Sequence, residues 1–97
     1  MLDDLMGKMQ QAQVEMEEAK TRMDSVFVEA EAEGGLVKVK ATANKQIAEI
    51  SISDEIVGDK EAIEDLLLVA MNRVLEQADQ VHTAEMQKIA AQSMGGF

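Results

Sequence analysis

Two adjacent glycines, Gly34 and Gly35, separate two runs of residues in which apolar and polar side chains alternate. The runs are residues 25–33 and 36–43, and a period of two is that of a half-buried β-strand. Glycine readily takes the positive φ angles that a two-residue hairpin turn needs. The sequence therefore predicts an antiparallel hairpin with a fixed register, in which Ala30 faces Val39 on the apolar side.

The polar side of this hairpin contains two lysines in a chain that is otherwise acidic. In the predicted register Lys38 stands opposite Glu31, and Lys40 stands between Glu29 and Glu49 of a third strand. Each lysine thus has a carboxylate as a neighbour. We expect this face to be close to neutral, so a site for an anionic ligand is to be sought elsewhere.

A third strand follows a second turn at residues 43–46. The run IAEISIS, residues 47–53, has Ala48, Ile50 and Ile52 on its apolar side and places Ile50 beside Val39 if the connecting loop has four residues. The three strands then form an antiparallel meander with one apolar face.

Two long helices flank the meander. Residues 2–23 contain no proline and carry an apolar seam with alternating steps of three and four residues, formed by Leu2, Leu5, Met9, Ala12, Met16, Ala19 and Met23. We expect this seam to pack against the second helix, which is predicted from about residue 59 to about residue 92, with Asp59 as its N-cap. The first half of that helix can lie on the sheet, and the second half should project.

Composition limits the function as well as the fold. Ninety-seven residues suit one domain, predicted at 1–92 with a flexible tail at 93–97. The chain has no cysteine, and its first residues carry two acids where a secretory signal would be basic, so we expect a cytoplasmic protein. The formal charge of -10, from 19 acidic and nine basic residues, repels nucleic acid unless the cations gather on one surface.

Catalytic and metal-binding patterns are not found in the sequence. His82 is the single histidine, on the narrowing apolar stripe of the second helix, and a lone helical histidine is more often a surface residue than a functional one. The glycine pair lacks the pattern of a phosphate-binding loop. We therefore predict that the protein is not an enzyme and uses no cofactor, metal ion or small-molecule substrate, and nothing predicts a membrane partner.

The motifs together resemble a known family. The Met- and Gln-rich helix LMGKMQQAQVEMEEAK, the block EAEGGLVKVKATAN, the ISIS strand end and the helix DKEAIEDLLLVAMNRVLEQA are similar to the YbaB/EbfC family of nucleoid-associated proteins. The resemblance implies an α+β fold of order α-β-β-β-α, with the sheets joined across a homodimer and helices that clasp duplex DNA. Because the family commonly has a glycine in this turn where this chain has Ala43, we expect Asn44 to take the left-handed conformation.

The resemblance also directs attention to cations on the helices. A nucleoid DNA-binding homodimer would contact phosphates through Lys8, near the start of the first helix, Lys20 and Arg22 at its end, and Lys88 on the projecting part of the second. Each of these residues could equally be an ordinary surface charge. The competing hypothesis is an acidic protein-interaction module that binds a partner of DNA metabolism without strong DNA affinity of its own. A third is a helix-exchanged oligomer without a ligand.

Overall fold

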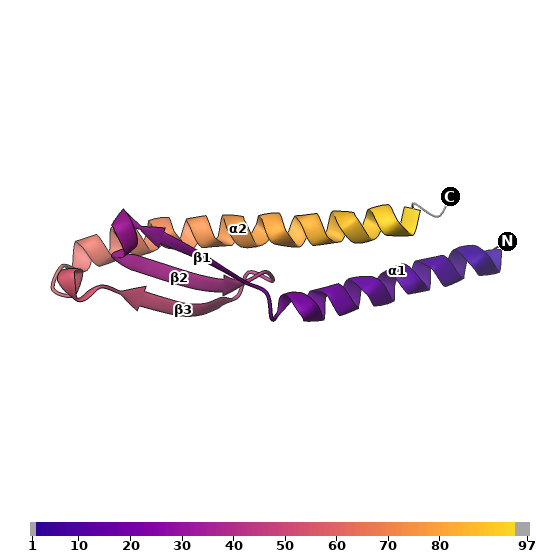
Figure 1. Ribbon diagram of the computed structural model, residues 1–97, viewed down its shortest axis with the longest axis horizontal. Helices are drawn as coiled ribbons and strands as arrows, with labels where there is room; N and C mark the ends of the chain where they lie inside the picture. Colours follow the sequence, from indigo (N-terminus) through magenta and orange to yellow (C-terminus); the bar gives the residue numbers. More distant parts are fainter. Residues whose placement is uncertain (1, 95–97) are drawn as a thin grey trace.

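The computed structural model describes the backbone of residues 2–94 and the side chains between residues 4 and 92. Helix α1 (Leu2–Met23) leads into strands β1 (Phe27–Ala32), β2 (Val37–Thr42) and β3 (Ile47–Ile52), and helix α2 (Lys60–Met94) completes the chain. Short 3₁₀ turns lie at Glu33–Gly35 (η1) and Asp54–Ile56 (η2). The strands form one antiparallel sheet in the order β1-β2-β3, which confirms the predicted α-β-β-β-α order and α+β class (Figure 1).

The first hairpin has the predicted register. Ala30 pairs with Val39 and Glu31 pairs with Lys38, as the glycine turn requires. Gly34 and Gly35 have φ angles of 65° and 95°, and the amide of Leu36 donates a hydrogen bond to the carbonyl of Glu33. These are the positive angles of a tight hairpin turn, in which an L side chain would be strained.

The second turn differs from the prediction in one respect. Lys45 takes the left-handed conformation (φ 66°), so the expectation for Asn44 is wrong. The loop has three residues, because the amide of Thr42 donates to the carbonyl of Gln46 at 2.8 Å and the amide of Lys45 donates to the carbonyl of Thr42 at 2.9 Å. A three-residue hairpin loop places its left-handed residue last, which is Lys45. An irregularity between Lys40 and Ala41 then restores the predicted pairing farther along the strands.

The first half of α2 covers two of the three strands. Val37, Val39 and Val74 are fully buried between the sheet and the helix, and small residues let the two layers approach closely; these are Ala30, Ala32, Ala41 and Ala70. The helix lies over β1 and β2, while β3 is the strand farthest from it (Figure 1). Ile50 on β3 is consequently 46% exposed although its neighbour Val39 is buried.

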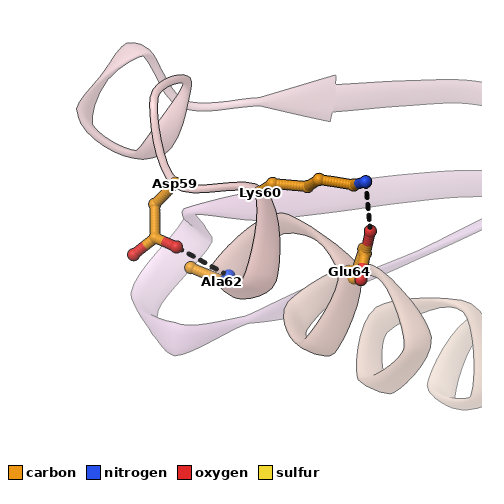
Figure 2. Close-up of polar contacts among 4 residues, drawn as sticks. All are labelled: Asp59, Lys60, Ala62 and Glu64. Atoms are coloured by element: carbon orange, nitrogen blue, oxygen red, sulfur yellow. Dashed lines mark hydrogen bonds and ion pairs between the residues drawn. The ribbon is translucent and has the colours of Figure 1, made fainter.

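The start of α2 is stabilised as the sequence predicts. The Asp59 carboxylate accepts a hydrogen bond from the amide of Ala62 at 3.1 Å, which is the N-cap interaction (Figure 2). One turn on, the Lys60 ammonium lies 3.9 Å from the Glu64 carboxylate (Figure 2). This ion pair is exposed and contributes little to stability, so the Asp59 cap is the main interaction that fixes the start of α2.

The second half of α2 and the whole of α1 project beyond the sheet as an antiparallel pair, which we call the leg (α1 and residues 78–94) (Figure 1). At its root Ala19, Met23, Ala43 and Ile89 form a buried cluster. The predicted seam of α1 is thus fully buried at its C-terminal end, whereas Leu5 and Met9 nearer the tip are 52% and 58% exposed. Helix α2 runs through Met94, two residues into the predicted tail, and residues 95–97 lie outside the described residues.

Candidate nucleic-acid interface

The root of the leg is fastened to the sheet by the turn between β2 and β3. Asn44 Nδ2 donates to the carbonyl of Lys20 at 2.7 Å and also to the Asp24 carboxylate. The first bond satisfies one of the carbonyls that the end of α1 leaves without a helical partner. Next to it, the amide of Ala43 donates to the carbonyl of Val26 at 2.8 Å. The direction in which α1 leaves the sheet is therefore set by polar contacts as well as by the buried cluster.

Two of the four predicted DNA-contacting cations lie at this root. Arg22 Nη2 is 3.6 Å from Glu85 Oε2 on α2, and both side chains keep some exposure, 61% for Arg22 and 35% for Glu85. Lys20 is exposed, and among the described residues it takes part in no ion pair. The structure thus gives Arg22 an acidic partner that sequence analysis did not foresee.

The other two candidates lie farther along the leg. Lys8 is exposed on α1 and borders a shallow hollow between the two helices, together with Gln11, Ala12, Glu15 and, from α2, Gln92. Lys88 is exposed and directly precedes the buried Ile89, whose cluster partner Ala19 directly precedes Lys20. All four predicted cations are accordingly on the leg, with Lys20 and Lys88 at the same level of it.

A further ion pair joins the sheet to α2. Lys45 Nζ is 2.7 Å from Asp79 Oδ1, and the hydrogen bond from this ammonium, with its charge, holds the pKa of Asp79 below the usual 3.8. Asp79 and Glu85 are the only acids between residues 78 and 94, so both acids of this half of α2 have a cation from another element beside them. Because the two members of each ion pair are far apart in the chain, no local sequence pattern predicts these pairs.

The two lysines of the sheet behave differently from what their neighbours suggest. Lys38 and Lys40 have the predicted glutamates as cross-strand partners, but within the described residues neither lysine forms an ion pair. Lys40 Nζ instead lies 4.6 Å from the centroid of the Phe27 ring, a cation–π contact. The face remains mixed in charge, with Glu29, Glu49 and Ser51 beside the lysines.

No catalytic constellation is found in the part of the chain that the structure describes. No group of three or more His, Asp or Glu side chains there could hold a metal ion. His82 is partly buried and has Asp79 near it. Neither α1 nor the described part of α2 contains a stretch apolar enough to cross a bilayer.

The negative charge is unevenly distributed. Residues 54–65 contain six carboxylates and a single lysine, which accounts for half of the formal charge of -10. This segment includes η2 and the start of α2, at the end of the molecule opposite the tip of the leg, and the molecule is 66 Å long (Figure 1). More of the net negative charge therefore lies at the sheet end of the molecule than on the leg.

Comparison with known proteins agrees with this architecture. The model of the YbaB/EbfC DNA-binding family matches residues 1–94. The chain belongs to this family. A nucleoid-associated protein of Flavobacterium johnsoniae is 38% identical over 90 residues, which cover 93% of this chain and 85% of the relative. One of Acetivibrio thermocellus is 40% identical over 98 residues, covering 99% and 86%.

The fold of this YbaB/EbfC family member is also seen in a crystal structure. An uncharacterized Helicobacter pylori protein, HP0035, superposes with a TM-score of 0.86 over 93% of this chain and 97% of its own. Its sequence is only 18% identical, so this likeness concerns the fold alone. The helix, three-stranded sheet and long second helix are thus kept while most side chains differ.

Proposed function

We propose that this protein is a non-enzymatic, nucleoid-associated DNA-binding protein that clasps duplex DNA as a homodimer through phosphate contacts. Membership of a DNA-binding family over residues 1–94 and the projecting leg support this function. The leg is the observation that carries the proposal, because α1 alone has 22 residues and is about 33 Å long, close to one turn of duplex DNA. The four cations Lys8, Lys20, Arg22 and Lys88 all lie on it.

The dimer is inferred from an apolar surface that one chain leaves uncovered. Ile50 and Ile52 lie on the α2 side of the sheet, because they pair with the buried Val39 and Val37. The uncovered flank of α2 borders a hollow lined by Leu67, Leu68, Met71 and Leu75. Leu68 is 63% exposed, and surfaces of this kind mark interaction sites.

The orientation of α2 shows that this flank leans toward β3. Arg73 Nη1 donates to the carbonyl of Glu31 on β1 at 2.8 Å, so Arg73 points to the β1 side. Met71 and Leu75 are each two residues away, about 200° around the helix. The flank and β3 together form one surface, which we call the open face (Ile50, Ile52, Leu67, Leu68, Met71 and Leu75).

A second copy is the occupant that suits the open face. β3 is an edge strand of six residues with an unpaired side, and such an edge pairs readily with an identical strand across a two-fold axis. We expect Ile50→Lys to halve the mass measured by light scattering, while Val14→Lys, at an exposed valine of α1, leaves it unchanged. An unaltered mass for Ile50→Lys would place the dimer contact elsewhere.

A titration of fluorescent duplex DNA at several salt concentrations tests the function itself. Phosphate binding predicts that the logarithm of affinity falls with the logarithm of salt, with a slope of about -0.9 per contact. Lys20→Gln and Lys88→Gln should each weaken binding and make the slope shallower by about one such contact per subunit. If no binding occurs even at low salt, the acidic protein-interaction module becomes the better description.

A further inference from the structure

The ion pair between Arg22 and Glu85 places an acid beside a residue that the clasp would use. Arg22 stands in the last turn of α1, next to Met23, which is only 1% exposed. Glu85 belongs to α2, four residues before the buried Ile89. Because Met23 and Ile89 share one buried cluster, the two backbones are held in place and the guanidinium stays within reach of the carboxylate.

The pair is held loosely although its backbones are fixed. The Nη2 to Oε2 distance of 3.6 Å is longer than the 2.7–2.9 Å of a charge-assisted hydrogen bond, and the Arg22 side chain is 61% exposed. Exposed pairs of this kind are weak. The planar guanidinium of an arginine can instead donate two parallel hydrogen bonds to two oxygens of one phosphate.

We propose that Glu85 competes with DNA phosphate for Arg22. In the free protein the Glu85 carboxylate pairs with the Arg22 guanidinium. On DNA binding a phosphate takes the place of the carboxylate, while α1 and α2 keep their positions. This inference rests on the proposed function, since it concerns one contact of the same clasp. Glu85 then lowers the affinity for DNA in two ways. Its ion pair with Arg22 must be broken, and its negative charge stays near the bound phosphate and repels it.

Glu85→Gln tests the competition, because it removes the charge and keeps the size of the side chain. We expect DNA affinity to rise by roughly three- to ten-fold at low salt, the range of one weak ion pair together with a relieved repulsion. The matched control is Glu17→Gln, which removes the same charge from an exposed position of α1 that takes part in no ion pair among the described residues. Its gain should be smaller, because it frees no cation.

A double-mutant cycle then separates competition for Arg22 from the general effect of removing one negative charge. In an Arg22→Gln background, Glu85→Gln should gain no more than Glu17→Gln does, because there is no guanidinium left to release. Equal gains from Glu85→Gln and Glu17→Gln in the wild-type background would overturn the inference, and so would a full gain from Glu85→Gln without Arg22. The proposed function stands in both cases, since DNA is still bound. Failure of every variant and of the wild type to bind DNA would instead overturn the function, and the inference with it.

Discussion

The buried cluster at the root of the leg should be the most sensitive point of the helical pair, and Met23→Ala is the substitution that tests it. Met23 is 1% exposed and packs with Ala19, Ala43 and Ile89. Truncating a buried methionine to alanine costs about 2–5 kcal/mol, depending on how far the neighbours can move into the cavity. Two of these neighbours are alanines fixed to backbone, so the cavity stays open and we expect a loss of about 3 kcal/mol.

Urea unfolding at a fixed protein concentration measures this loss, with Met16→Ala as the control on the same predicted seam. Met16 is 39% exposed, so its truncation should cost less than about 1 kcal/mol. Amide hydrogen exchange adds the location, because α1 should lose protection in Met23→Ala before the sheet does. Similar costs for both substitutions would refute the conclusion that the seam is most tightly packed at its C-terminal end.

Three further predictions concern single contacts. Because Lys45 lowers the pKa of Asp79, the pair stabilises the folded protein at pH values above the ordinary pKa of 3.8. This stabilisation is lost as the pH falls through the lower pKa that Asp79 has in the folded protein. Lys45→Met should therefore reduce the melting temperature at pH 6 and have no effect near pH 2. Gly34→Ala, at φ 65°, should lower the free energy of unfolding in urea by roughly 1–2 kcal/mol, and Gly34→Asn by less. Arg73→Met removes the bond to the Glu31 carbonyl and should cost about 1 kcal/mol, with faster amide exchange in β1; unchanged exchange there would show that the bond does not secure the strand.

Local patterns were sufficient to predict the elements and much of their pairing. The bounds of α1, the Asp59 cap and the register of the first hairpin follow from periodicity, a capping side chain and a glycine turn, all of which act between near neighbours in the chain. The second turn was predicted less well. Its loop has three residues and a bulge in place of four residues, and both solutions bring Ile50 beside Val39, so the apolar pattern could not distinguish them.

The candidate interface was only partly predictable, because its charges interact across elements. The sequence marked Arg22 as a cation on a helix end but could not show that α2 brings Glu85 to it. Similarly, the cross-strand glutamates made Lys40 look neutralised, whereas its ammonium lies over Phe27. Side chains choose among several neighbours in space, and only the packing of α1 on α2 and of β1 on β2 determines which neighbours are present.

The net charge of the chain is a weaker argument against DNA binding than its size suggests. Charges in salt near physiological strength act over a Debye length of about 8–10 Å, whereas the molecule extends over 66 Å. The carboxylates of residues 54–65 lie at the end opposite the tip of the leg and are screened from a phosphate bound there. The leg itself, α1 with residues 78–94, carries seven acids and four bases, so its own excess of negative charge is three. Under the proposed function we therefore expect DNA affinity to depend on which acids of the leg pair with a cation, and Glu85 is the acid that lies beside Arg22.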